Sequence, residues 1–326
     1  MNFDTDIKNN AALAPMAGVT DEPMRRLCME MGASFCVSEM ISAKALSLGD
    51  NKTKALMAFT ESERPFGIQI FGTEPDIMAD AAAYISENLR PDFLDINMGC
   101  PAPKIAGSGA GSALMKDPVL AGRIAERCVR ASAVPVTVKM RAGWETDTAA
   151  AFASVLEQSG VSMITVHGRT AKQMYRPPVD LSAIRQVKKA VSVPVIGNGD
   201  IFSPEDAVRM MSETGCDGVM IGRGAMGDPF LFARVSALLA GKSVPEKPSA
   251  EEKMRILRRH AAELCELKGE YVAMREMRRH AACYIKGFRG AAALRAQAAA
   301  LEKLSDIDSF IDRVLTAAMN QDDSQK

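Results

Sequence analysis

The stretch Phe93-Leu94-Asp95-Ile96-Asn97-Met98-Gly99-Cys100-Pro101 decides the fold, because a short apolar run stops abruptly at a Gly-Cys-Pro turn. Buried parallel strands have short continuous apolar runs, and catalytic groups in α/β folds gather where such strands end. The turn therefore places a thiol on a loop that leaves a strand. We expect Cys100 to act chemically, although a small buried cysteine at a turn is the simpler structural alternative.

Seven further apolar runs alternate with helical stretches, at residues 11–15, 35–38, 67–71, 134–140, 163–167, 193–197 and 218–222. Several intervening helices have a capping side chain before proline at the start, namely at residues 21–23, 74–75, 117–118, 203–205 and 228–229. With the run at 92–97, eight strand–helix units predict an α/β fold of the (β/α)8 TIM-barrel type. The alternative is an open doubly wound sheet, but its usual Gly-x-Gly-x-x-Gly is missing after the first strand.

A change of pattern near residue 245 predicts a second domain. Residues 241–249 carry prolines and charges, and the chain beyond them shows only helical spacing, as in Met254, Leu257, Ala261 and Leu264. We therefore expect a barrel domain over residues 1–244 and a small helical bundle over 245–320. The polar residues 321–326 are expected to be a frayed tail.

The composition excludes several classes of protein. The 326 residues carry a net charge of +0, so any nucleic-acid partner must find a local patch. The seven cysteines lack paired CxxC spacing, which argues against zinc or a disulfide framework. Neither a secretory leader nor an apolar run long enough to span a membrane is visible, so a cytoplasmic location is expected. No obligate protein partner is evident, and the oligomeric state stays open.

Polar side chains occur where several predicted strands end. Alternation along residues 136–141 puts Thr137, Lys139 and Arg141 on one face. A central barrel strand has both faces covered, and an unpaired buried lysine is costly, so a functional role is favoured over an exposed strand end. Gln69 is equally consistent with a ligand contact and with a bond to a neighbouring strand, while His167 alone is a weak signal.

Two glycine-rich loops follow the last two predicted strands, Gly197-Asn198-Gly199-Asp200 and Gly222-Arg223-Gly224. Plain turns are the alternative, but these two loops commonly form the phosphate site of a (β/α)8 barrel. No carboxylate cluster suited to a metal accompanies them. An organic phosphate cofactor is therefore expected, and FMN is the natural candidate, with Lys139 stabilising negative charge on its reduced ring.

At these residues the chain resembles the tRNA-dihydrouridine synthase family, and within it the bacterial B type. The matching segments are LAPMAGVTD at 13–21, DINMGCPAPK at 95–104, VKMR at 138–141, VHGRT at 166–170, GNGD at 197–200 and DGVMIGR at 217–223. The segment Tyr175-Arg-Pro-Pro-Val-Asp180 departs from the glycine-containing stretch that is more usual there. The role of its Arg176-Pro177-Pro178 stays open.

The resemblance implies a role for each matching residue. Under it, Cys100 is the catalytic acid, and Asn97 and Arg141 contact the uracil. The flavin would be lined by Pro15, Met16, Ala17, Gln69, Lys139 and His167, with its phosphate end held by Asn198, Gly199, Asp200, Gly222 and Arg223.

The implied reaction is reduction of the C5–C6 double bond of a uridine in tRNA, with the D-loop favoured. Hydride would pass from N5 of reduced FMN to C6, and a thiol with an ordinary pKa of about 8.5 would protonate C5. NADPH or NADH would reduce FMN again, and the sequence decides neither the donor nor the uridine. The alternatives are an FMN barrel acting on free pyrimidines, as a dihydroorotate dehydrogenase does, and an RNA-binding protein built on a disused barrel.

A local basic run supplies the patch that the net charge lacks. Between residues 275 and 295 the cations are Arg275, Arg278, Arg279, Lys286, Arg289 and Arg295, against the single acid Glu276. We expect Arg275, Arg278, Arg279 and Lys286 to lie near one helix face and to follow tRNA phosphates. A solvated charged face is the alternative.

Overall fold

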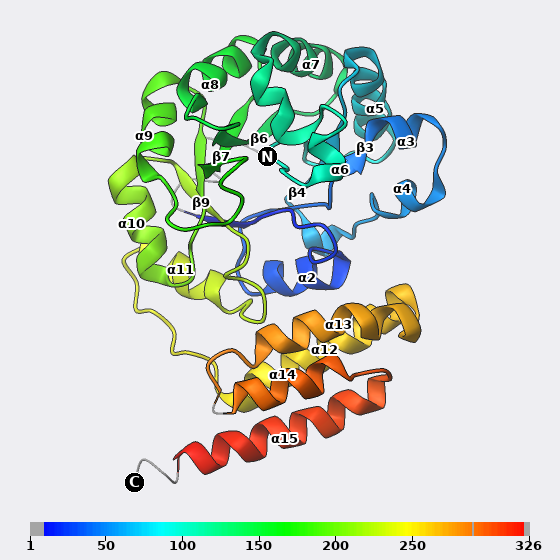
Figure 1. Cartoon of the computed structure of the whole chain (residues 1–326), viewed down its shortest axis with the longest axis vertical. Helices are drawn as coiled ribbons and strands as arrows, with labels where there is room; N and C mark the ends of the chain where they lie inside the picture. Colours follow the sequence, from blue (N-terminus) through cyan, green and yellow to red (C-terminus); the bar gives the residue numbers. More distant parts are fainter. Residues whose placement is uncertain (1–9, 289, 323–326) are drawn as a thin grey trace.

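The computed structural model describes residues 10–288 and 290–322, and its first part is a barrel of parallel strands (Figure 1). The barrel strands are β1 (Ala11–Leu13), β2 (Cys36–Val37), β4 (Phe66–Phe71), β5 (Phe93–Met98), β6 (Val136–Gly143), β7 (Met163–Thr170), β8 (Val195–Asn198) and β9 (Gly218–Ile221). They pair in the order β1-β9-β8-β7-β6-β5-β4-β2. Backbone bonds from Leu13 N to Phe35 O (3.0 Å) and from Ser34 N to Ala11 O (2.9 Å) join β1 to the chain at β2. The predicted (β/α)8 barrel is confirmed.

Helices surround the barrel and follow its strands in sequence. They are α2 (Glu22–Glu30), α3 (Ala43–Ser47), α4 (Asn51–Ala55), α5 (Pro75–Asn88), α6 (Pro103–Ala106), α7 (Pro118–Ala131), α8 (Ala149–Gln158), α9 (Leu181–Ala190), α10 (Pro204–Thr214) and α11 (Leu231–Leu239), with 3-10 turns at Glu61–Glu63 and Gly111–Lys116. Within the described ranges, none of the helices combines the length and the apolar character needed to cross a membrane.

Four of the five predicted helix starts are confirmed. One of these four, α5, begins at Pro75 as predicted, but the Glu74 side chain makes no capping hydrogen bond. Side-chain oxygens of Asp21, Asp117 and Ser203 accept hydrogen bonds from the first turns of α2, α7 and α10. The start predicted at Asp228-Pro229 is wrong, because α11 begins two residues later, at Leu231. Strand β3 (Ile41–Ser42), which pairs with β4, has no counterpart among the predicted runs, because two residues carry no periodicity.

Alternation along the strands points every second side chain into the barrel. The inward side chains are apolar toward the amino end of the strands and mostly polar toward the carboxyl end. Toward the amino end lie buried apolar side chains such as Phe35, Phe93 and Met163. Gly67 leaves the space that the Phe93 ring occupies, since a Cβ there would lie 2.3 Å from a ring carbon. Two residues further along β5, β6, β7 and β8 the inward side chains are polar, so functional groups collect at the carboxyl end. There the strands contribute Asp95, Asn97, Thr137, Lys139, Thr165, His167 and Asn198.

The chain after residue 249 forms a helical bundle with its own apolar core. Its helices are α12 (Ala250–Lys268), α13 (Glu270–Tyr284), α14 (Ala291–Ala299) and α15 (Leu304–Asp322). The residues whose spacing predicts these helices, Met254, Leu257, Ala261 and Leu264, are all buried in that core. Helix α15 continues to Asp322, into the segment expected to fray, and residues 323–326 lie outside the described residues.

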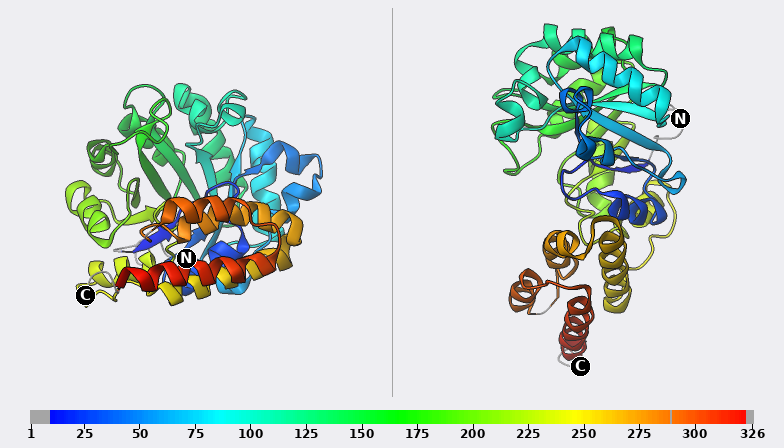
Figure 2. Two further views of the ribbon diagram at one scale, coloured as in Figure 1. Left: turned by 60° about the horizontal axis from the view of Figure 1, so that its bottom comes forward. Right: turned by 90° about the vertical axis from the view of Figure 1, so that its right-hand side faces the viewer.

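The bundle packs against the barrel through α2, which lies between the barrel and α12–α13 (Figures 1 and 2). Leu27 of α2 belongs to the apolar core of the bundle. Arg259 of α12 makes two bonds of 2.5 and 2.6 Å to the Glu30 carboxylate. Gly227, in the loop after β9, lies against the backbone of α13, where a Cβ would be 2.4 Å from Tyr284 N. The close approach of the loop after β9 to α13, and the ion pair between α12 and α2, therefore fix the position of the bundle on the barrel.

Replacing Gly227 by alanine tests this docking contact. Gly227 has φ +75°, and Gly215, which ends α10, has φ +72° with nothing within 4 Å of its Cβ position. Gly215→Ala carries only the cost of a left-handed alanine, about 1 kcal/mol, whereas Gly227→Ala adds the clash with α13, about 1–3 kcal/mol more. Urea titration of both variants gives the two free energies of unfolding. Equal losses would contradict the docking contact.

Candidate active site

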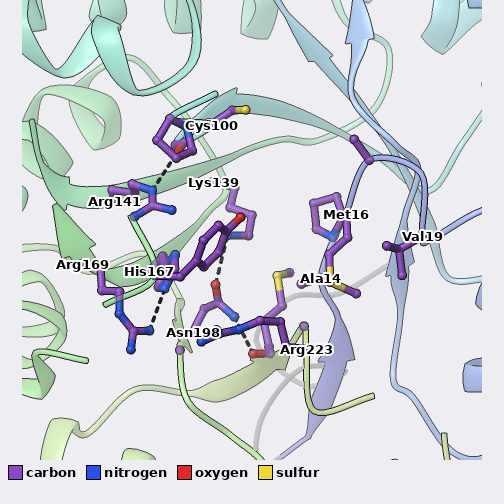
Figure 3. A pocket seen from close by; sticks show the side chains of 18 of the residues that line it. Ala14, Met16, Val19, Cys100, Lys139, Arg141, His167, Arg169, Asn198 and Arg223 are labelled. Carbon is purple, nitrogen blue, oxygen red and sulfur yellow. Dashed lines mark hydrogen bonds between the residues drawn. The ribbon is translucent and has the colours of Figure 1, made fainter. Parts of the chain in front are cut away.

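A cavity of about 430 Å³ opens at the carboxyl ends of the barrel strands (Figure 3). The structure brings together nearly all the residues predicted to form a site. The cavity is lined by Pro15, Met16, Ala17, Gln69, Asn97, Cys100, Lys139, Arg141, His167, Asn198, Gly199, Asp200, Gly222, Arg223 and Arg279. Of the predicted residues, Arg275 and Arg278 lie elsewhere.

A chain of hydrogen bonds runs from the centre of the barrel to the Cys100 loop. The Asp95 carboxylate, 3% exposed, accepts from Gln69 Nε2 at 2.7 Å and from Thr137 Oγ1 at 2.6 Å. Gln69 Oε1 accepts from Asn97 Nδ2 at 2.8 Å. Asn97 Oδ1 then accepts from the backbone N–H groups of Gly99 (3.1 Å) and Cys100 (2.9 Å).

The chemistry of Asp95 orients every amide along this chain. Burial raises the pKa of Asp95, but the bonds from Gln69 and Thr137 and the charge of Lys139 favour the carboxylate. A carboxylate only accepts hydrogen bonds, so Gln69 must turn its NH2 group toward Asp95 and its oxygen toward Asn97. Asn97 must in turn point its oxygen at the Cys100 loop. Asp95 accepts from Gln69, Gln69 accepts from Asn97, and Asn97 accepts from the Cys100 loop, so the charge of Asp95 fixes the orientation of both amides.

The Cys100 loop is also held from its other side. The carbonyl of Cys100 accepts from the backbone N–H and from Oγ of Ser112, both at 3.0 Å. Gly111 allows this approach, because a Cβ there would lie 2.7 Å from Cys100 O. Arg141 Nε donates to Gly99 O at 2.8 Å. The thiol is thus presented to the cavity from a backbone that is fixed at several points.

Lys139 supplies a positive charge on the floor of the cavity. Its Nζ donates to Asn198 Oδ1 at 3.1 Å, and Asn198 Nδ2 is itself fixed by Met220 O at 2.7 Å. Desolvation lowers the pKa of Lys139 to about 8, with the neighbouring Arg141 acting in the same direction and Asp95 opposing it. Lys139 therefore remains largely protonated at pH 7.

His167 is neutral, and its contact with Arg169 determines which ring nitrogen carries the proton. Burial, and then the charges of Lys139, Arg141, Arg169 and Arg223, hold the pKa of His167 well below its usual range. Arg169 Nη1 lies 3.3 Å from His167 Nε2. Since a guanidinium only donates, Nε2 accepts and Nδ1 carries the ring proton.

Asp200, in the first glycine-rich loop, pairs with two arginines at one end of the cavity, Arg223 from the second loop and Arg169 from β7. Asp200 accepts from Arg223 Nη2 at 3.0 Å and also pairs with the buried Arg169. The role predicted for Asp200 at the phosphate end stays a prediction, and its side chain pairs with cations that a phosphate would also attract. Its observed contribution is to orient Arg169 and Arg223. Figure 3 shows these arginines on the same side of the cavity as Asn198.

The three arginines predicted to share one face of α13 have different partners. Arg275 lies over the Tyr271 ring, 3.4 Å from its centroid, and Arg278 Nε donates to Leu301 O at 2.8 Å within the bundle. Arg279 donates to Gly18 O in the loop after β1. Helix α13 is packed by the bundle on one side and by the barrel on the other, so its arginines turn apart. Arg289 lies outside the described residues.

Several residues around the cavity were not assigned a role from the sequence. Asp95 and Arg169 share the strand parity of Asn97 and His167, so alternation alone could have indicated that they point inward. Tyr175 and Phe202 also line the cavity, from loops after β7 and β8. Loop residues follow no periodicity, so nothing in the sequence could place these two rings.

Replacing Asp95 tests the hydrogen-bond chain without reference to any activity. Asp95→Leu removes the acceptor for Gln69, whereas Asp95→Asn keeps an oxygen that can accept from Gln69 Nε2. We expect the amides of Gly99 and Cys100 to exchange with deuterium on the order of ten-fold faster in the leucine variant, and close to normally in the asparagine variant. Exchange mass spectrometry of peptides covering residues 97–102 measures this. Unchanged exchange in Asp95→Leu would show that the loop does not depend on Asp95.

Comparison with known proteins identifies the family. The family model "Dihydrouridine synthase (Dus)" matches residues 12–320. The tRNA-dihydrouridine synthase B of Pseudomonas syringae pv. tomato is 39% identical over 326 residues, which cover 98% of this chain and 96% of the relative. That of Vibrio vulnificus is 40% identical over 315 residues, covering 94% and 97%.

Solved structures share the fold at low sequence identity. Histamine dehydrogenase from Rhizobium sp. 4-9 superposes with a TM-score of 0.53 and 13% identity, over 78% of this chain and 48% of that one. Because this likeness is one of fold alone, the assignment depends on the family model and on the relatives of nearly equal length. On those grounds the chain belongs to the dihydrouridine synthase family and is an oxidoreductase.

Proposed function

We propose that this protein is a tRNA-dihydrouridine synthase that reduces the C5–C6 double bond of uridine in tRNA to 5,6-dihydrouridine. FMN is the proposed cofactor and NADPH or NADH the reductant, which makes the reaction a CH–CH oxidoreduction. The observation that carries the proposal is that the anchored Cys100 and the cationic Lys139 line the same cavity. The names of the relatives support tRNA as the substrate.

The residues around the cavity fit FMN. Ala14, Met16 and Met220 offer apolar surface to a flat ring, and Lys139 places a positive charge beside it. The arginines that pair with Asp200 lie at the end of the cavity that we propose for the phosphate, where Gly199 and Gly222 also line the wall. When bound, reduced FMN supplies a hydride to C6 of the uracil.

Cys100 is the proposed acid. The C5–C6 double bond is conjugated with the C4 carbonyl, so addition at C6 leaves negative charge on C5 and O4. C5 then takes its proton from the Cys100 thiol, which becomes a thiolate and recovers a proton from solvent. Asn97 and Arg141 hold the backbone of the Cys100 loop. We propose that Arg141 Nη2 and the Asn97 Nδ2 hydrogen that faces the weak acceptor Met40 Sδ bind the uracil carbonyls.

The helical bundle is proposed to hold the tRNA. A stacked uridine reaches the cavity only when it is swung out of the RNA, and contacts to phosphates supply affinity without choosing the base. Arg275 is exposed and suits a phosphate contact, whereas Arg278 is half-buried and engaged with Leu301. Arg279 is exposed at the cavity and uses only Nη2 to bond to the loop after β1, so its other nitrogens can still donate. We therefore propose phosphate contacts for Arg275 and, at the cavity rim, for Arg279.

Cys100→Ala tests the proposed acid. The variant should bind FMN normally and lose dihydrouridine formation by about 10²–10⁴-fold, the usual contribution of a positioned acid. Mass spectrometry of nucleosides from a treated tRNA transcript measures the product, and flavin fluorescence measures the bound cofactor. Cys265→Ala, at a half-buried thiol outside the cavity, is the matched control. Wild-type rates in Cys100→Ala would remove Cys100 from the mechanism.

The pKa of Lys139 predicts a pH dependence that can be separated from the thiol. Reduction of bound FMN by NADPH in the absence of tRNA needs no acid from Cys100, so it is measured with the wild-type thiol, which contributes to the pKa of Lys139. As the pH rises through about 8, Lys139 loses its proton, and the positive charge that favours the reduced flavin is lost. Stopped-flow traces should therefore slow above pH 8. In Lys139→Met, reduction should be slow over the whole pH range and should not decline above pH 8. If the decline persists in this variant, a group other than Lys139 causes it.

A further inference from the structure

Five side chains at the mouth of the cavity alternate between cation and aromatic ring. In order they are Arg141, Tyr175, Arg223, Phe202 and Lys286, and we call them the cation–aromatic ladder. The Arg141 and Arg223 guanidinium carbons lie 5.6 and 5.1 Å from the Tyr175 ring centroid. The Arg223 carbon and Lys286 Nζ lie 5.7 and 5.1 Å from the Phe202 centroid.

The ladder leads from the interior of the barrel to the helical bundle. Arg141 is 2% exposed, whereas Tyr175 and Phe202 are 52% and 44% exposed. Lys286 is exposed and follows the end of α13. The first four members line the cavity, and the fifth belongs to the bundle. The ladder therefore marks a path along which a chain could leave the cavity toward the bundle.

The exposed rings are held by a fixed backbone. On one side of Tyr175, Arg141 Nη1 donates to Met174 O at 2.8 Å, and on the other side Arg169 Nε donates to Arg176 O at 2.8 Å. Phe202 N donates to Asp206 Oδ2 at 3.0 Å at the start of α10. Two large exposed rings on fixed loops beside a cavity are poorly explained by packing, because neither ring is buried in a core.

Alternating cations and aromatic rings suit one class of ligand. Unpaired nucleotides stack their bases on aromatic faces while cations neutralise their phosphates, and this binding tolerates any base sequence. A folded duplex offers no free base faces, so the ladder fits nucleotides that are already unstacked. A uridine swung into the cavity leaves such nucleotides beside it.

We propose that the cation–aromatic ladder binds the unstacked ribonucleotides that adjoin the target uridine. Tyr175 and Phe202 stack on the bases of these nucleotides, and Lys286 neutralises a phosphate that joins them. Arg223 contacts both rings and also lies at the proposed phosphate end of the cofactor site. This inference rests on the proposed function, because it needs an RNA substrate in the cavity. It adds a binding site for the neighbours of the uridine.

The test uses flavin-loaded protein and a tRNA transcript whose modified position has first been located by mass spectrometry. A fluorescent 2-aminopurine is placed on either side of that position, since stacking on an aromatic ring quenches it. Wild-type protein should quench at least one of the two probes. Phe202→Leu should lose that quenching and weaken tRNA binding on the order of ten-fold, with FMN affinity unchanged. Lys286→Gln should lower the salt slope of binding by about 1.

The matched control is Tyr84→Leu, which removes an exposed ring on α5, outside the cavity lining. It should change neither quenching nor affinity. Absence of quenching in the wild type, equal quenching in Phe202→Leu, or a loss confined to FMN affinity would each overturn the ladder. If the wild type forms no dihydrouridine, the proposed function falls and the ladder with it. If Phe202→Leu forms dihydrouridine and binds tRNA as the wild type does, only the ladder falls.

Discussion

Asp95 lies at the centre of the barrel with a carboxylate that can only accept hydrogen bonds, and the geometry of the site follows from that restriction. Gln69 and Asn97 must take one orientation each, and the loop of Cys100 receives an acceptor at the end of the chain. The same carboxylate lies near enough to Lys139 to favour its charged form. One buried group thus orders the proposed proton donor and supports the cation across the cavity.

The barrel and the bundle form the cavity together. Arg279 of α13 reaches the loop after β1, whose Pro15, Met16 and Ala17 line the proposed flavin site, and Lys268 of α12 bonds to Asp21 at 3.0 Å just beyond it. A small shift of the bundle would therefore move residues at the cavity rim. For the proposed RNA substrate of a protein with no net charge, the arrangement offers local cations, with Arg279 where the two parts meet and Arg275 exposed on α13.

The barrel could be predicted from the sequence because its strands are short apolar runs that end in glycine turns. Alternation also found Lys139 and Arg141, since their strand has one inward face. The same rule would have found Asp95 and Arg169, but neither differs in sequence from a residue in an ordinary surface ion pair. The positions of two cavity rings, Tyr175 and Phe202, could not be predicted. Nor could the separate partners of Arg275, Arg278 and Arg279. Both depend on tertiary contacts between loops and helices far apart in the chain. The ion pairs of Asp200 with Arg169 and Arg223 also could not be predicted, because they join a loop to residues of β7 and of the loop after β9.

The central claim is that a cofactor in this cavity and the thiol above it reduce a uridine within tRNA. The most direct measurement is mass spectrometry of an unmodified tRNA transcript before and after incubation with the purified flavoprotein and NADPH. The account predicts that one uridine gains two hydrogens, and that omitting NADPH prevents the gain. A protein that binds FMN and oxidises NADPH, yet leaves every uridine of the transcripts unchanged in mass, would contradict it.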